Sequence, residues 1–404
     1  MKMNKSIFIG TSLTIFPFSL TLGAGMERTT QSVAAFLQPN HYFEAGINVL
    51  DPNVSGKIDA DFNKGGLSAA ANMDTGNIAN HYIAPSAALK LQLTDHFSIG
   101  FLYDHPFGSD SLYPIQKLPA YTEGDASTGA KVTTQNLSTI VGYQPNENWN
   151  FYAGPVLQTV KGETHVRGAG YMWLKYDMTT SEKLGTGWLA GIAYSIPEIA
   201  LKTSLTYRSE IDHDVKMTES LALRHPVYGV TDFGTDVSPS TVTTPQSINL
   251  DLQSGIMADT VAFANVRWVE WSKNKISPPK LYKTTQQVMG KGIDLVTYYE
   301  DQISANVGLG RKLNDHWGGS LSVGWDSGAG DPITTLGPTK GYWNVGVGFK
   351  FSPQPNYDIA LGVKHFWLGD ARAQSAADFG TNNSDAYFSN NTAWAYGLKI
   401  GYKF

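Results

Sequence analysis

The sequence has no cysteine, few charged residues and no long apolar run in its main part. Without cysteine there is no disulfide scaffold, and no cysteine at an export cleavage site to carry a lipid. Charged residues make up 16% of the 404 positions, below the ~25% of ordinary soluble domains. Beyond residue 24 no stretch of about 18 apolar residues occurs, which excludes membrane-spanning helices. The net charge of −5, without a basic run, gives no sign of a nucleic-acid partner.

The first residues have the pattern of an export signal. Lys2 and Lys5 precede an apolar stretch from Ile7 to Leu22, and small residues follow at positions 23–25. This order predicts a signal peptide over residues 1–24. A membrane anchor is the alternative, although Pro17 and several hydroxyl residues interrupt the apolar stretch.

The last twelve residues alternate between apolar and small or charged side chains. Trp394, Tyr396, Leu398, Ile400, Tyr402 and Phe404 share one face, and Ala393, Ala395, Gly397, Lys399, Gly401 and Lys403 share the other. Side chains alternate with a period of two along a strand, so this segment has one apolar wall. A terminal strand that ends on an aromatic residue is typical of bacterial outer-membrane barrels.

Alternating segments recur along the whole chain and predict fourteen strands. They lie at about 41–52, 81–93, 96–106, 132–144, 148–162, 184–196, 199–214, 245–257, 260–273, 297–312, 316–326, 341–352, 357–368 and 393–404. Short turns alternate strictly with longer polar loops, which lie near 53–80, 107–131, 163–183, 215–244, 274–296, 327–340 and 369–392. Outer-membrane barrels combine an even number of strands with short periplasmic turns and long outer loops.

We therefore expect an all-β fold: a transmembrane antiparallel β-barrel of about fourteen strands over residues 41–404, in the bacterial outer membrane. Residues 25–40 precede the first strand and contain the apolar stretch Val33 to Leu37. This segment enters from the periplasmic side, and folding into the lumen is favourable because it removes its apolar residues from water. It is expected to form a short N-terminal plug.

The sequence contains no constellation of residues that indicates catalysis or a cofactor. The nine His are scattered and lack the spacing of metal ligands, and nothing marks a serine hydrolase triad. We expect neither an enzyme nor a bound metal. Arg208 and Glu210 are expected to face the lumen together as an ion pair that braces the lumen or the plug, and a substrate role for the pair is the alternative.

Several short motifs occur in an order and spacing similar to those of a known family, and Tyr207-Arg208-Ser209-Glu210 is the most specific of them. The others are Ala84-Pro85, Asp95-His96-Phe97 with Gly100, Leu137 to Tyr143, Asn148-Trp149-Asn150-Phe151, Gly187 to Tyr194, Trp271-Ser272 and the closing strand. In these motifs the chain resembles the FadL-type outer-membrane transporters of long-chain fatty acids and other hydrophobic compounds. It departs from that family in its shorter plug, which lacks an Asn-Pro-Ala motif, and in the short segment 163–183.

The resemblance implies a monomeric barrel, inserted by the barrel assembly machinery, that captures a hydrophobic small molecule at its outer loops. The molecule passes to an apolar pocket beside the plug and leaves sideways into membrane lipid where the third strand kinks. That kink falls at His105 to Gly108, with Pro106 and Gly108 as the residues that interrupt the strand.

The resemblance also implies four substrate-binding residues. Phe36 and Leu37 lie in the plug, Phe107 at the kink, and Arg167 within one position of a family contact for a substrate carboxylate. Long-chain fatty acids are the favoured cargo. A general porin for small polar solutes and a structural or adhesion barrel remain alternatives.

Overall fold

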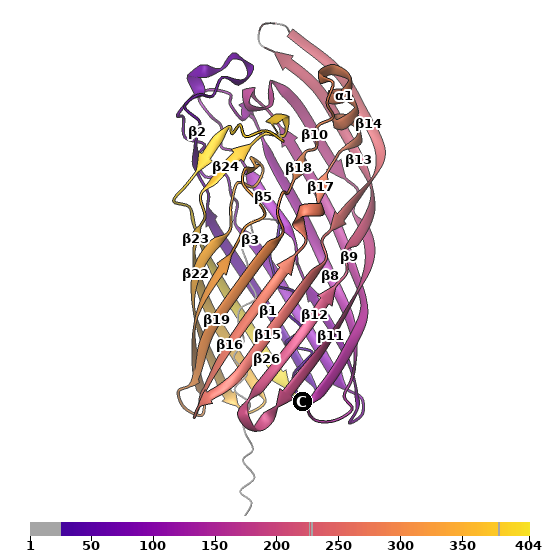
Figure 1. Ribbon diagram of the computed structural model, residues 1–404, viewed down its shortest axis with the longest axis vertical. Coiled ribbons are helices and arrows are strands. Elements are labelled where there is room, and N and C mark those ends of the chain that lie inside the picture. Colours follow the sequence, from indigo (N-terminus) through magenta and orange to yellow (C-terminus); the bar gives the residue numbers. More distant parts are fainter. Residues whose placement is uncertain (1–25, 226, 228, 379) are drawn as a thin grey trace, which may run out of the picture.

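The computed structural model describes residues 26–225, 227, 229–378 and 380–404. The predicted signal peptide, residues 1–24, lies outside the described residues and stays a prediction. The rest of the chain forms a closed barrel of antiparallel strands, with short turns at one end and elaborate loops at the other (Figure 1). The C-terminus lies at the turn end.

The barrel wall has fourteen positions, several of which are built from two successive strands. In order they are β1 (Tyr42–Asn53), β3 (Tyr82–Gln92), β4 (Phe97–Asp104) with β5 (Gly108–Leu112), β8 (Gly129–Tyr143), β9 (Trp149–Val166), β10 (Leu174–Thr180) with β11 (Lys183–Ile196), β12 (Leu201–Arg208) with β13 (Ile211–His225), β14 (Gly229–Thr244) with β15 (Ser247–Met257), β16 (Thr260–Val269), β19 (Gln302–Lys312), β20 (Trp317–Asp326), β22 (Tyr342–Gln354), β23 (Tyr357–Leu368) and β26 (Thr392–Lys403). The pairing of β1 with β26 closes the barrel.

This arrangement confirms the predicted fourteen-stranded antiparallel barrel. The prediction of loops at 163–183 and 215–244 is wrong, because β9, β10, β13 and β14 extend through most of these segments. In β13 the outward face carries Asp212, Asp214 and Lys216, whereas the inward face buries His213 and Glu219. Val215, Met217 and Leu221 are also buried on the inward face, so the apolar residues of β13 face inward, which is the opposite of a lipid-facing strand.

The faces of the closing strand match the prediction from its sequence. On β26, Trp394 is 44% exposed and Tyr396 45%, whereas Ala393 and Ala395 are each 1% exposed. Exposed apolar side chains recur on the outward face of β20, β22 and β23. The outward face is thus an apolar belt, and the small and polar side chains face the lumen.

The loop end carries its own small elements. A four-stranded sheet joins β2 (Gly56–Ile58), β25 (Ala386–Phe388), β24 (Ala371–Gln374) and β21 (Ile333–Thr334), and two further pairs join β6 (Thr122–Glu123) to β7 (Ala126–Ser127) and β17 (Lys275–Ile276) to β18 (Val296–Thr297). The helix α1 (Pro279–Met289) packs against β13 and β14. The buried Glu219 carboxylate accepts the backbone N–H groups of Lys280 and Leu281, at 2.9 and 3.0 Å, and so satisfies donors at the start of α1. Among the described residues, no helix has both the length and the apolar character to cross a membrane.

Residues 26–40, which we call the plug, lie inside the barrel. Val33 and Phe36 are each 1% exposed and form an apolar cluster with lumen-facing residues, including Ile140, Tyr152 and Leu189. A larger apolar cluster fills the loop half of the lumen. The plug therefore separates two parts of the barrel interior.

Candidate functional site

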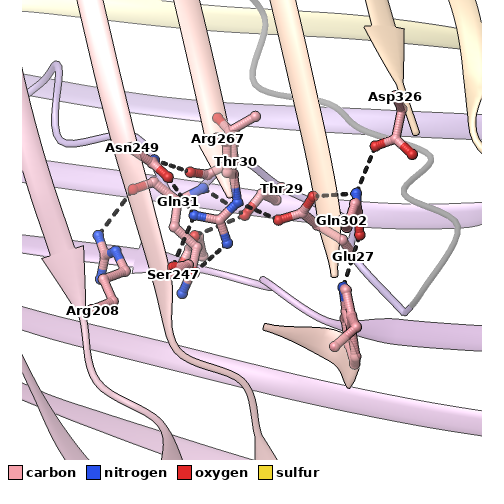
Figure 2. Close-up of polar contacts among 12 residues, drawn as sticks. Glu27, Thr29, Thr30, Gln31, Arg208, Ser247, Asn249, Arg267, Gln302 and Asp326 are labelled. Atoms are coloured by element: carbon pink, nitrogen blue, oxygen red, sulfur yellow. Dashed lines mark hydrogen bonds and ion pairs between the residues drawn. The ribbon is translucent and has the colours of Figure 1, made fainter. Parts of the chain in front are cut away.

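A buried ion pair attaches the plug to the barrel wall (Figure 2). Glu27 of the plug and Arg267 of β16 are both fully buried, and the Arg267 Nε donates to the Glu27 carboxylate. The Arg267 guanidinium also donates to Gln31 Oε1 at 2.9 Å, Asn249 Oδ1 at 2.5 Å and Ser247 Oγ at 3.1 Å. A buried pair is favourable only when its remaining hydrogen-bonding groups are satisfied, and these contacts provide that.

The same network continues along the plug and into neighbouring strands (Figure 2). The Gln302 amide of β19 donates to Glu27 at 3.1 Å and to Asp326 at 2.6 Å. Asn249 donates to the Thr30 carbonyl at 2.6 Å, and Arg208 donates to the Gln31 carbonyl at 3.0 Å. Polar groups from β12, β15, β16 and β19 thus hold one side of the plug.

An apolar seat holds the other side of the plug. The Phe36 ring lies 5.7 Å from the Tyr152 ring, between centroids. It packs over two glycines of the wall: a Cβ built on Gly100 would lie 2.4 Å from Phe36, and one on Gly142 would lie 2.7 Å from it. These glycines provide the space that the aromatic ring fills.

The wall is interrupted between its second and third positions. Ladder pairing of β3 with β4 runs from Gln92–Ser98 to Ala87–Tyr103 and then stops. Tyr82–Ser86 still pairs with β1, but it has no ladder partner on the side of β4 and β5. We call this interruption, between Tyr82–Ser86 and Asp104–Gly108, the gap. Pro85 and Pro106 lie on its two edges, and neither can donate a backbone hydrogen bond.

The start of the plug pairs with the inner side of the gap. Gly108 N–H donates to the Met26 carbonyl at 2.6 Å, and Arg28 N–H donates to the Pro106 carbonyl at 2.7 Å. Glu27 and Phe107 form an isolated antiparallel bridge. The backbone groups of Pro106 and Gly108 are therefore satisfied by the plug, and those of Phe107 by the Thr134 hydroxyl of β8, rather than by β3.

An apolar pocket adjoins the gap on the lumen side. Among the residues described, those that line it include no charged side chain, and their polar groups are mainly the hydroxyls of one serine and six threonines. The lining is Met26, Phe107, Ser109, Ala130, Val132, Thr134, Val160, Gly162, Thr164, Met178, Thr180, Met217, Val242, Thr243, Thr244, Pro245, Ile276, Leu295, Val296, Tyr298, Thr334, Leu336 and Gly337. Such a lining suits an apolar ligand oriented by a few weak hydrogen bonds.

The structure brings one of the four predicted substrate-binding residues to this pocket. Phe107 lines it and packs edge-on against Trp271, with ring centroids 5.6 Å apart. Phe36 and Leu37 belong to the apolar seat of the plug instead. Arg167 is 6% exposed and is engaged by Asp177 at 2.5 Å and by the carbonyls of Val166 and Tyr176.

The predicted Arg208–Glu210 ion pair is wrong. Arg208 is buried and donates to Gln31 and Ser138, whereas Glu210 is exposed. The reason is the break between β12 and β13 at residues 209–210, where Ser209 bonds to Trp188 and the strict alternation of faces is lost. The predicted kink at Pro106 and Gly108 does coincide with the interruption between β4 and β5.

Sequence reasoning missed Met26, Arg28 and most of the pocket wall. The pocket hydroxyls lie on strands where Thr alternates with apolar residues, for example Thr134 on β8 and Thr164 on β9. Such a pattern does not distinguish a pocket from any other part of the lumen. Arg28, within the predicted plug, was the available signal, because a cation in a lumen segment needs a partner.

Solved structures of hydrophobic-compound channels have similar folds. A FadL homologue from Pseudomonas aeruginosa matches with a TM-score of 0.69 at 14% identity, over 96% of this chain and 97% of that one. The Pseudomonas putida toluene transporter TodX matches with a TM-score of 0.61 at 14% identity, over 96% of each chain. The Ralstonia pickettii toluene transporter TbuX matches with a TM-score of 0.57 at 12% identity, over 92% of this chain and 91% of that one. At these identities the likeness concerns the fold.

The family itself is identified from the sequence. No curated protein sequence matches the chain significantly. The family model described as "Outer membrane protein transport protein (OMPP1/FadL/TodX)" matches residues 32–404, which include the whole barrel and most of the plug. The chain therefore belongs to the OMPP1/FadL/TodX family of bacterial outer-membrane transport proteins, which are channels for hydrophobic compounds and not enzymes.

Proposed function

We propose that this protein takes up small, uncharged hydrophobic compounds through the pocket and releases them sideways into membrane lipid at the gap. The observation that carries the proposal is the chemistry of the pocket, whose described lining has hydroxyls but no charge. Placing an unpaired carboxylate there would cost several kcal/mol, on the order of the penalty for any isolated buried ion. A neutral molecule, by contrast, gains about 0.8 kcal/mol for each CH₂ group removed from water.

The position of the gap supports sideways release. Phe107 lines the pocket and also lies at the kink of the third wall position, so pocket and gap share a residue. The plug blocks the alternative route to the periplasm, because Val33 and Phe36 are buried against the wall. An apolar cargo that moves into lipid stays out of water, whereas one that moves through the lumen does not.

Long-chain fatty acids remain a second candidate cargo. The half-buried Arg28 supports this reading, because it lies against Gly108 beside the pocket and could receive a carboxylate. Arg167 supports a fatty-acid cargo less well, because its guanidinium already donates to Asp177 and to two backbone carbonyls. Aromatic hydrocarbons fit the charge-free lining without any such partner.

The pocket can be tested with a pair of variants on one strand. Val242→Phe fills the pocket from β14, whereas Val237→Phe adds the same bulk on an exposed position of the same strand. We expect uptake of toluene by cells that carry Val242→Phe to fall at least about tenfold, with Val237→Phe close to wild type. Equal uptake by both variants would contradict the assignment of the pocket. A large, steady conductance of the wild type in planar bilayers would favour a porin instead.

A further inference from the structure

Arg28 lies between the two edges of the gap. Its Cζ is 5.1 Å from the centre of the Tyr82 ring on β3, and its Cγ lies 3.6 Å from a Cβ built on Gly108 of β5. Its backbone is fixed by the bond to Pro106. The side chain thus spans the opening that missing strand pairing leaves in the wall.

The guanidinium of Arg28 has few partners there. Its Nε makes no hydrogen bond, and the Tyr82 hydroxyl beside it is also without one. Asp110, two residues beyond Gly108, is paired with Lys131 at 2.9 Å and accepts a hydrogen bond from Asn80 at 2.7 Å. Among the residues that the structure describes, no carboxylate forms an ion pair with Arg28. A cation–π contact is then the main interaction of its charge, which is weaker than a charge-assisted hydrogen bond.

We propose that Arg28 is the exit gate of the pocket, closing the gap against Tyr82 and selecting cargo by charge. Uncharged cargo displaces the side chain from Tyr82 and passes. A carboxylate pairs with the guanidinium and is held at the gate. Only the selection of cargo by charge rests on the proposed function. The closure of the gap by Arg28 and Tyr82 does not depend on what the protein transports.

The closure can be measured without any transport, because the chain contains no cysteine and a single one can be introduced. Ser109→Cys lines the pocket just beyond the gap. In lipid vesicles, its reaction with a maleimide carried on a membrane-dissolved alkyl chain reports access from the bilayer. We expect Arg28→Ala and Tyr82→Ala each to raise that rate at least about tenfold, because each removes one partner of the contact that closes the gap.

Two controls separate gate opening from damage. Arg224→Ala removes an arginine of the outer hairpin that pairs with Glu123, and it should leave the rate unchanged. A water-soluble maleimide should react equally slowly in all variants, since none of the substitutions removes the Glu27–Arg267 pair that holds the plug in the lumen. If the lipid-phase rate is the same with and without Arg28, the gate does not exist. If only the water-phase rate rises, Arg28 seats the plug and does not close the gap, which also overturns the proposal.

The charge selection is tested with decanol and decanoate, which share one chain and differ in the head group. We expect decanoate to inhibit decanol uptake by the wild type, and at least about tenfold more decanoate to be needed with Arg28→Met, which keeps bulk but loses charge. Equal inhibition of both proteins would refute the selection. If the wild type takes up no decanol, the proposed function fails, whereas the labelling experiment still decides the gate.

Discussion

The pairing of Glu27 with Arg267 allows a sharp test of how the plug is held. Arg267→Met removes the guanidinium and fills much of its volume. Of the contacts that reach the Glu27 carboxylate, the hydrogen bond from Gln302 at 3.1 Å then remains. A fully buried carboxylate is left without its cation.

The magnitude follows from this burial. Breaking a buried ion pair by removing one partner costs about 3–5 kcal/mol, because the other charge stays desolvated. That cost applies to the seated plug and not to the unseated one, where Glu27 can reach water. The unseated fraction should therefore rise by roughly two to four orders of magnitude.

Hydrogen exchange followed by mass spectrometry measures this fraction through the backbone amides of residues 26–38. We expect much faster exchange of this segment in Arg267→Met, with exchange of the barrel strands unchanged. The double variant Glu27→Gln/Arg267→Met should recover most of the protection, since it buries no unpaired charge. Arg311→Met, at an exposed arginine of β19, is the matched control. The reasoning is refuted if residues 26–38 exchange as slowly in the single variant as in the wild type, or as fast in the double variant as in the single one.

Three further variants probe other contacts. Gly100→Ala should reduce the free energy that holds the plug in place by about 1–3 kcal/mol, because the added Cβ would lie 2.4 Å from Phe36. The same exchange experiment measures this change. Glu219→Ala should lower the stability of α1 by about 1–2 kcal/mol, because the N–H groups at its start lose their acceptor. Hydrogen exchange should be faster over residues 279–289 and unchanged elsewhere. Burial raises the pKa of Asp59 in the outer loops, so the folded state binds its proton more tightly and loses stability as pH rises through that pKa. The melting temperature of Asp59→Asn should exceed that of the wild type at pH 7 and equal it at pH 3. A difference in melting temperature that is the same at both pH values would contradict this.

The barrel was predictable from sequence because lipid imposes a simple rule on its outward face. Along β26, for instance, every second residue meets lipid and is apolar, so twelve residues suffice to identify the strand. The rule fails where a strand leaves the membrane. In β13 the outward residues meet water and the inward ones include His213 and Glu219, so the segment resembled a polar loop.

The site was less predictable, because its contacts join residues far apart in the chain. Glu27 meets Arg267 across 240 positions and Gln302 across 275. Nothing local to residues 26–31 indicates these partners. Arg208 illustrates the same limit: its nearest acidic neighbour in sequence, Glu210, is exposed, and its partner is a backbone carbonyl of the plug.

The plug is anchored unequally on its two sides, and this bears on how the outer membrane stays sealed. Toward β12, β15, β16 and β19 it is tied by the buried ion pair and its amide partners, whereas toward the gap it is tied by backbone hydrogen bonds and the Arg28–Tyr82 contact. In the sideways release that we propose, the weaker ties break while the stronger ones hold. Cargo would then leave through the wall without the lumen becoming a water-filled pore, and the permeability barrier against polar solutes would be kept during each passage.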